Sequence, residues 1–483
     1  MVAVVAVAVL VGVGVAGVPL AERYAASRIK AEIERDGQAS VGTVAVGLID
    51  RSVILTDFRS RAFGDLTVRR WETSGIAESF GALLAGRTPF SGVELGDPLR
   101  ADHLALTDAR IVDPSTGASW NAGSLVVDGL DLAAYDADAT GPRRLAILTA
   151  RIAAALRLKH AEARNVHRVL ALGSDTVFVR SAALHGVDRG RIGALVMADI
   201  EATPKGGAEA SLKVDDARAR EIELSRALAQ LAGRSQTLGR IEIGSASATG
   251  FGGVLLSSNG VSLQSISFET SRQTVDSSQS RLRIENLILQ PGANREAVRL
   301  RVLLQAMGLS ELRLSLDCTG EERRSKGELG IPDCSLSAAD LGEVKLAAEF
   351  EGADEAFWRA VDTGDATALP RSSLALVSAK LMMVDKGAIE RSVRALTTAT
   401  GRPAAVARAN LASDIRGYQP PDILITQDFT KLLDTAARFI EQGGTLAVVA
   451  RPDPPLGLGT ASGLSVASPD LVQLLGLSAT LSR

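Results

Sequence analysis

The sequence predicts an α+β protein in which an N-terminal transmembrane helix precedes a long, mostly antiparallel β-sheet with interspersed helices. Three observations lead to this fold class. Residues 1–20 contain no charged side chain. Many later segments alternate apolar and polar residues with the period of two that is typical of a half-buried strand. These segments follow one another through short turns instead of alternating regularly with helices, which disfavours a doubly wound parallel sheet.

The composition favours a folded protein with a large core. Hydrophobic residues make up 46% of the 483 residues and charged residues 23%, which is typical of globular chains and not of disordered ones. The net charge of −3 is too close to neutral for a nucleic-acid-binding surface. We therefore expect no nucleic-acid partner.

The segment 1–20 is long enough to cross a bilayer. At ~1.5 Å per helical residue, about 20 residues span a hydrocarbon core of ~30 Å. We predict a transmembrane anchor at 1–20 and a juxtamembrane helix at 21–37, which Gly37 ends. Two alternatives remain open. One is a cleaved signal peptide, for which Val15-Ala16-Gly17 is a tolerable cleavage site although a charged leader is missing. The other is a buried core helix.

The charges around this segment conflict with an exported body. Arg23, Arg28, Lys30 and Arg35 follow the span and no basic residue precedes it, so the positive-inside rule alone places the body in the cytoplasm. An incorrectly assigned start codon also explains this pattern. Two features favour a periplasmic body instead. The body resembles an exported architecture, and its two cysteines suit an oxidising compartment. We therefore expect a single-pass inner-membrane protein with its bulk in the periplasm, and the inner membrane as its partner.

The body is predicted to consist of a β-rich region, 38–352, and a mixed helix and strand region, 353–483. Val44 and Val46 begin the alternation, and Leu312, Leu314 and Leu316 form a clear amphipathic strand. These five residues are the candidate apolar groove.

Several elements are predicted within these regions. Helices are expected at 75–85, 142–163, 215–232, 293–307, 354–362, 386–399, 403–415 and 428–442. A short strand is expected at 253–256. Five aspartates are expected at strand edges or turns, where Asp bonds its own backbone: Asp50, Asp57, Asp108, Asp128 and Asp131.

The two cysteines form the most specific local signal. Cys318 continues the alternation of Leu312–Leu316, and a charged, turn-rich segment separates it from Cys334. A hairpin centred on 324–327 brings the two residues near the ~5.5 Å Cα spacing of a disulfide. Such a bond stabilises a chain in an oxidising compartment by about 3 kcal/mol in the chain-entropy model. The alternative is a pair of free, buried thiols.

No motif indicates catalysis. Residues 12–17 match a GxGxxG string but lie inside the apolar segment without a preceding strand, so helix packing is the better interpretation. Ser27–Lys30 matches SxxK without its companion motifs. His160 and His167 are expected around a helix end, in a basic segment where only Glu162 could join a metal site. We therefore expect no catalytic residue, no metal site, no cofactor and no enzyme.

Several strings resemble AsmA-like envelope proteins of Gram-negative bacteria. Leu83–Gly86 and Leu99–Leu106, after the N-terminal span, resemble the start of these proteins. Later strings are similar to strand pairs in exported uncharacterised relatives, namely Met307–Ser310 with Leu312–Leu316, Ala339–Leu346, Gly443–Val448, and Ser468–Leu471 with Leu474–Leu477. The resemblance implies a sheet folded into a taco-shaped groove with an apolar interior, a role in lipid traffic or outer-membrane assembly, and phospholipid as a partner. This chain is shorter than the longest members, and its C-terminal part is richer in helix.

Two functions are therefore expected to compete. A lipid-handling envelope protein requires an open apolar sheet face, whereas a structural or assembly factor has a closed core and no ligand. An envelope enzyme, the third class, needs a converging polar cluster that the sequence does not reveal.

Overall fold

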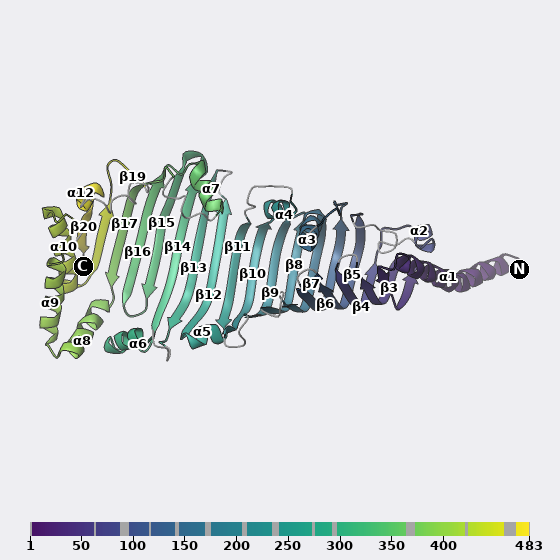
Figure 1. The fold of residues 1–483 in the computed structure, drawn as a ribbon, viewed down its shortest axis with the longest axis horizontal. Helices are drawn as coiled ribbons and strands as arrows, with labels where there is room; N and C mark the ends of the chain where they lie inside the picture. The colour runs from purple at the N-terminus through teal and green to yellow at the C-terminus, as the bar shows by residue number, and fades with distance from the viewer. Residues whose placement is uncertain are drawn as a thin grey trace. The chain divides into compact units, whose positions relative to one another are not determined.

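The chain divides into two compact units, a first unit Met1–Gly244 and a second unit Ser245–Arg483. The computed structural model describes residues 2–61, 64–86, 96–114, 117–140, 144–169, 175–204, 210–233, 241–272, 276–291, 297–363, 372–420, 424–457 and 470–482. All strand pairs described within each unit are antiparallel. The predicted antiparallel sheet with interspersed helices is thus confirmed (Figure 1).

The first unit is an antiparallel meander. Strands β3 to β10 pair in sequence order, and both β1 and β2 pair with β3. The strands are β1 (Ala39–Ser40), β2 (Thr43–Gly47), β3 (Ser52–Ser60), β4 (Asp65–Ser74), β5 (Leu99–Val112), β6 (Ser119–Leu132), β7 (Leu156–Val169), β8 (Thr176–Asp188), β9 (Arg191–Thr203) and β10 (Leu212–Glu223). The helices are α1 (Val2–Glu34), α2 (Phe80–Leu84), α3 (Arg144–Ala155) and α4 (Ser225–Leu231).

The C-terminal half of α1 packs onto the first strands. Ala25 and Ile29 are fully buried and Ile33 nearly so, in a core that also contains Val53 and Leu55 of β3. Polar contacts fix the register of this packing. The Glu22 carboxylate accepts a hydrogen bond from the Leu48 backbone N–H at 3.2 Å. The Lys30 ammonium donates to the Gly42 carbonyl at 2.9 Å. This part of α1 is therefore an integral layer of the first unit.

The predicted membrane anchor comprises residues 1–20. The side chains of residues 1–17 lie outside the part of the chain that the structure describes. Among the described residues, no helix combines the length and the apolar character that crossing a bilayer requires. The anchor stays a prediction.

The strands of the first unit bend along two rows that run across the sheet. In one row, a left-handed residue lies in the middle of each odd-numbered strand: Asp57, Asp108, Asn165 and Asp199, with φ between 50° and 54°. In the other row, Gly129, Gly186 and Glu221 occupy the even-numbered strands β6, β8 and β10, and Gly75 follows β4. At these crossings the register skips one residue on both strands, except between β6 and β7 beside Gly129, where it skips two on each strand. The two paired strands therefore bend at the same place, and such local irregularities increase the twist of a sheet.

The kinks change which residues face the core. On β3 the buried residues are Val53, Leu55 and then Phe58, so the alternation resumes one residue late after Asp57. On β7, Leu158 and Ala161 are buried on either side of a skipped position. Apolar residues along one strand therefore follow spacings of two and three in turn.

The second unit continues the meander plan. Strands β11 to β17 pair in sequence order, β17 pairs with β18 and β19, and β18 pairs with β20. The strands are β11 (Glu242–Gly252), β12 (Val261–Arg272), β13 (Ser277–Leu289), β14 (Leu312–Arg323), β15 (Glu328–Ala338), β16 (Gly342–Glu351), β17 (Ala375–Asp385), β18 (Thr445–Ala450), β19 (Leu456–Gly457) and β20 (Ser478–Ser482). The predicted boundary at residue 352 lies between β16 and β17, which are paired along their length.

The helices of the second unit lie at the ends and the margin of its sheet. They are α5 (Val254–Ser258), α6 (Ala297–Ala306), α7 (Glu355–Thr363), α8 (Ala388–Thr400), α9 (Ala404–Arg416), α10 (Gln427–Gln442) and α12 (Leu471–Leu474), with a 3-10 turn η3 (Arg324–Lys326). Helix α10 contacts β18 and β20 (Figure 1). Arg416 of α9 forms ion pairs with Asp434 and Glu441 of α10 at 3.1 and 2.7 Å, which joins these two helices.

Two predicted helices are right only in part, and one predicted strand is wrong. The helix expected at 142–163 ends at Ala155, and β7 begins at the next residue. The segment 215–223 belongs to β10 instead of a helix, and only Ser225–Leu231 is helical. The strand expected at 253–256 is the short helix α5. In the first two cases, the spacing of two and three imitates a helical pattern.

Candidate functional site

The first unit presents one apolar sheet face. We call a row of cross-strand register partners on this face an apolar rung. Four rungs cross β5 to β10. They are Leu104–Val127–Ala161–Leu184–Leu195–Ala219, Leu106–Leu125–Ala163–Ala182–Met197–Ala217, Ala109–Ala122–Val166–Val179–Ile200–Val214 and Ile111–Trp120–Arg168–Val177–Ala202–Leu212. Leu104, Val127 and Ala161 are buried, whereas most of the other side chains keep partial contact with solvent.

The second unit presents an apolar face that is more exposed. Two rungs cross eight strands, from β12 to β18 and β20. They are Ile266–Ile284–Leu316–Leu336–Val344–Met383–Leu446–Leu481 and Phe268–Leu282–Cys318–Cys334–Leu346–Leu381–Val448–Ala479. Within these rungs, Leu282 of β13 is 36% exposed, Leu336 of β15 42%, and Val344 and Leu346 of β16 are 38% and 37% exposed. Large apolar side chains gathered in this way on an exposed face mark a binding surface more often than single exposed ones do.

The five predicted groove residues lie in different environments. Val46 is 8% exposed and Val44 packs against the same core beside α1, so these two residues contribute to a filled interior. Leu312, Leu314 and Leu316 are half-buried on β14, within the apolar face of the second unit. The structure therefore separates Val44 and Val46 from the three leucines.

The predicted cysteine pair lies on the same face as the leucines. Cys318 of β14 and Cys334 of β15 are direct register partners and form a disulfide bond. They occupy the rung that continues through Leu282 and Leu346. The bond therefore ties two central strands of the apolar face together.

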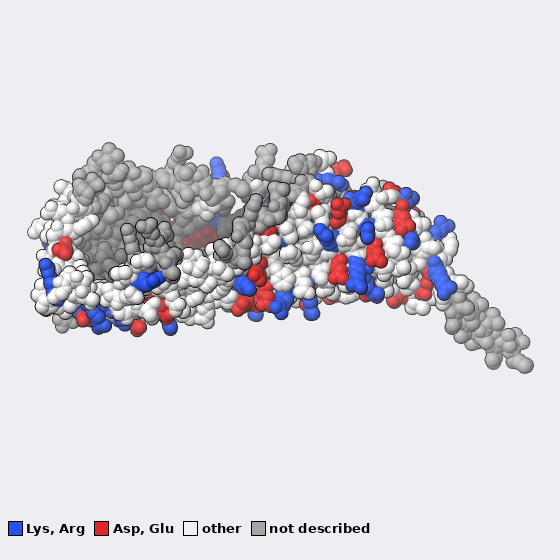
Figure 2. Space-filling view, turned by 60° about the horizontal axis from the view of Figure 1, so that its bottom comes forward, with Lys and Arg blue, Asp and Glu red and all other residues white. Residues whose placement is uncertain are grey.

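Charged side chains cover the opposite face of the first unit. Arg164 forms an ion pair with Glu162 at 2.7 Å, and Arg218 with Asp216 at 2.7 Å. Lys, Arg, Asp and Glu side chains are interleaved over the strands of this unit (Figure 2). Such exposed pairs contribute little stability. The sheet of this unit therefore has one charged, solvent-exposed face and one apolar face.

The opposite face of the second unit carries a stronger charge cluster. The Arg281 guanidinium of β13 donates hydrogen bonds to the Asp317 carboxylate of β14, one of them at 2.7 Å, and Arg283 lies 3.4 Å from the same carboxylate. These hydrogen bonds and the two positive charges lower the pKa of Asp317 below its ordinary value. Asp317 is therefore an ionised partner in a cross-strand pair.

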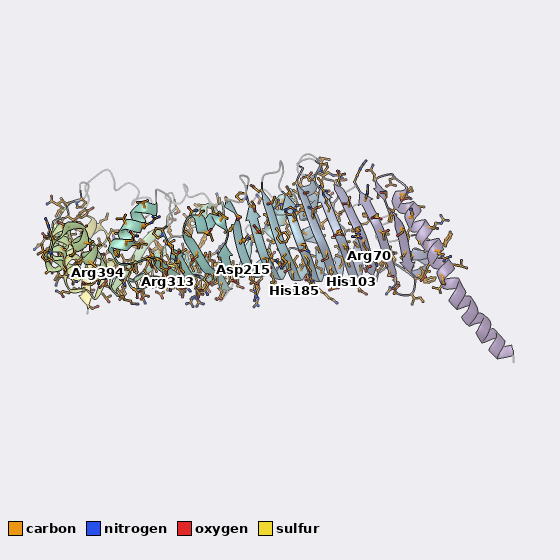
Figure 3. The ribbon with its side chains drawn as sticks, turned by 90° about the horizontal axis from the view of Figure 1, so that it is seen from below. Arg70, His103, His185, Asp215, Arg313 and Arg394 are labelled. Carbon is orange, nitrogen blue, oxygen red and sulfur yellow. A yellow bond between two sulfur atoms is a disulfide. The ribbon has the colours of Figure 1, made fainter. Side chains whose placement is uncertain are left out.

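The histidines lie on strands and not around a helix end as predicted. His160 and His167 both belong to β7. His160 faces His185 of β8 with 3.2 Å between their Nδ1 atoms, and His103 Nδ1 lies 2.7 Å from an Asp128 carboxylate oxygen. His103 and His185 lie among the polar residues that Figure 3 labels. Within the described ranges, no three His, Cys, Asp or Glu residues come close enough to hold a metal ion.

Three of the five aspartates predicted at strand edges or turns lie inside strands instead, namely Asp57, Asp108 and Asp128, whereas Asp131 lies next to the end of β6 as predicted. Asp57 and Asp108 are the left-handed residues of β3 and β5, and Asp131 of β6 pairs with Arg100 at 2.9 Å. Only Asp50 lies in a turn, where it accepts a hydrogen bond from Ser52 at 2.9 Å. Asx residues tolerate the left-handed conformation because their short polar side chains bond locally.

Two of the described depressions are open and lie along strands. One of about 550 Å³ is lined by residues of β12 to β15, including Arg283, Asn286 and Asp317. Another of about 360 Å³ lies at the ends of β14 to β17, beside Leu329, Phe350 and Val377. Neither brings a nucleophile and a base together among the residues described.

The exposed apolar residues of the second unit's sheet face were not among the predicted groove residues. Leu282, Leu336 and Leu346 alternate correctly within their strands, but the alternation does not reveal whether other elements cover that face. Trp120 and Arg168 were missed as well, because an Arg in an alternating strand is normally assigned to the polar face.

Comparison with protein families gives one match in the C-terminal part of the chain. A family model described as "Uncharacterized protein" matches residues 335–482, which run from β15 to β20. The search of curated proteins gives no match.

Proposed function

We propose that this chain is a membrane-anchored periplasmic protein that binds lipid along the apolar face of its sheet and thereby contributes to maintenance of the cell envelope. The observation that carries this proposal is the exposed group Leu282 of β13, Leu336 of β15, and Val344 and Leu346 of β16, within the two apolar rungs of the second unit. Acyl chains covering these residues would remove apolar surface from water, which favours binding by ~0.8 kcal/mol for each buried CH₂. Headgroups would remain in water.

Two further observations support the location. The apolar segment 1–20 has the length of a bilayer anchor. The Cys318–Cys334 disulfide is typical of an oxidising compartment such as the periplasm. The resemblance to AsmA-like envelope proteins agrees with both. The inner membrane and phospholipid are therefore the proposed partners, and no catalytic step is part of this function.

Site-specific photo-crosslinking tests the lipid proposal. A photoreactive amino acid at Leu346 should crosslink to phospholipid in cells, because this position lies on the exposed apolar face. The same amino acid at Lys345 is the matched control, since adjacent residues of a strand point to opposite faces. Native mass spectrometry of the purified protein should show bound lipid. Equal crosslinking at both positions, or protein free of lipid, would contradict the proposal.

A second candidate function is a structural or assembly factor without a ligand. It is favoured by the filled core beside α1, where Val46, Leu48 and Leu55 are buried. This function predicts that replacing Leu346 with Lys leaves cellular function intact as long as the protein folds. The lipid proposal predicts a loss of function for the same variant.

A further inference from the structure

One basic residue lies on the apolar face of the first unit. Arg168 of β7 occupies an apolar rung between Trp120 of β6 and Val177 of β8. Ile111 continues that rung on β5 and Ala202 on β9. Arg168 is the one charged member of the four rungs that the structure describes in β5 to β10.

An aromatic ring holds this guanidinium in place. The Cζ atom of Arg168 lies 4.4 Å from the centroid of the Trp120 ring, and Trp120 is 44% exposed. Stacking on Trp is favourable for a guanidinium and leaves its in-plane N–H groups free to donate. Trp120 therefore holds the charge of the half-buried Arg168 side chain at the apolar face.

Arg168 has no counter-ion among the residues that the structure describes. Its Nε atom is buried without a hydrogen-bond partner, and no carboxylate pairs with its side chain among the residues that the structure describes. Arg164, four residues earlier on β7, forms an ion pair with Glu162 on the polar face. An uncompensated cation beside an apolar surface is costly unless a ligand supplies the negative charge.

We propose that Arg168, stacked on Trp120, binds the phosphate of an anionic phospholipid whose acyl chain lies over the apolar rungs of the first unit. A planar guanidinium matches the geometry of a phosphate and can donate two parallel hydrogen bonds to it. The inference rests on the proposed lipid-binding function and specifies the class of lipid.

The dimensions of the face agree with this arrangement. One acyl chain corresponds to about half of a ~30 Å hydrocarbon core, or about 15 Å. At ~3.3 Å per residue, this length covers about five residues of strand. From Arg168, an acyl chain along β7 passes over Val166 and reaches Ala163. Both residues are members of apolar rungs.

A binding experiment with two lipids tests the proposal. The full-length protein in detergent is titrated with phosphatidylglycerol, which is anionic, and with diacylglycerol, which has the same chains and no phosphate. Arg168→Gln should weaken phosphatidylglycerol binding about tenfold or more, because a hydrogen-bonded charge is lost, and should leave diacylglycerol binding unchanged. Arg164→Gln is the matched control on the opposite face and should alter neither.

Two further measurements distinguish charge from geometry and bound lipid from free phosphate. Arg168→Lys retains the charge and loses the bidentate geometry, so it should give an intermediate affinity and serves as the folded comparison if the Gln variant is unstable. Inorganic phosphate at millimolar concentration should not displace phosphatidylglycerol. Displacement by it would assign the site to free phosphate and overturn the lipid assignment.

The outcomes separate the two proposals. Equal binding of phosphatidylglycerol by wild type and Arg168→Gln refutes the role of Arg168 while lipid binding stands. Equal losses for both lipids assign Arg168 a merely structural role. Failure of the wild type to bind either lipid removes the proposed function and this inference together.

Discussion

At the scale of single residues, the left-handed positions determine where the strands of the first unit bend. Asn165 on β7 has φ 54°, a region where most L-residues are strained by ~1 kcal/mol or more. The same row contains Asp57, Asp108 and Asp199, which also have short side chains. The residue types at these positions are therefore explained by the left-handed backbone conformation and not by a catalytic or binding role.

Asn165 offers a direct test of this demand. Asn165→Ala should lower the stability by about 1 kcal/mol, whereas Asn165→Gly should be neutral or slightly stabilising, because only glycine adopts a positive φ without strain. The urea midpoint of the full chain, followed by circular dichroism, provides the measurement. Both variants lose the same side-chain amide, so equal effects would show that the amide matters and the backbone does not.

The Asp317 carboxylate predicts how stability depends on pH. The hydrogen bonds from Arg281 lower its folded-state pKa, so the pair contributes stability above the unfolded-state pKa of ~3.9. This contribution is lost as the pH falls through the folded-state value. The midpoint of the unfolding transition should therefore fall less between pH 5 and pH 2.5 in Asp317→Asn than in the wild type. Arg281→Gln should reduce this fall similarly; an unchanged slope in both variants would exclude the pair as the cause.

At the scale of elements, the C-terminal half of α1 is the best-defined helix–sheet contact. Ile29 is fully buried against the first strands. Ile29→Ala should destabilise the protein by about 2–4 kcal/mol through lost burial and a residual cavity. Ile49→Ala, at a position that is 83% exposed, should cost less than about 0.5 kcal/mol. Thermal unfolding of both variants decides whether α1 is a structural layer or a loosely attached stalk.

The elements also show what the sequence could predict. The helices near 388–400, 404–416 and 427–442 were predicted to within a few residues, because their apolar residues keep the helical period. The first part of β7, up to Ala163, was predicted as helix because the strand spaces its apolar residues by two and three. Cys318 and Cys334 were correctly placed opposite each other, since local alternation and one hairpin suffice to set that pairing.

The remainder of the candidate site depends on non-local information. Whether Leu336 is open or covered depends on helices far away in the chain, and Leu446 in the same rung is buried where α10 meets β18. The stacking of Arg168 on Trp120 depends on a pairing across 48 residues of sequence. Alternation predicts the faces of a strand, but not what covers them.

At the scale of the whole molecule, membrane attachment and lipid binding are proposed to depend on different parts of the chain. Deletion of residues 2–20 should release the protein from membranes, because the apolar segment supplies the attachment. Val44 and the strands that follow remain in the shortened chain, so lipid should still copurify with it. Carbonate extraction of membranes from cells with either form, followed by mass spectrometry of the released protein, tests both points. Full-length protein in the carbonate-soluble fraction would refute the anchor.

The two rows of kinks also have a consequence for how such a sheet can vary in size. Left-handed residues alternate between odd-numbered strands in one row and even-numbered strands in the other. The smallest unit that can be inserted or deleted is consequently a hairpin of two strands. Gain or loss of one strand would place two strands with the left-handed residue in the same row next to each other. Duplicating one hairpin would widen the sheet by about 10 Å, at ~4.8 Å per strand, and would lengthen each apolar rung by two residues without disturbing the others. Capacity for larger ligands can thus evolve in even-numbered steps.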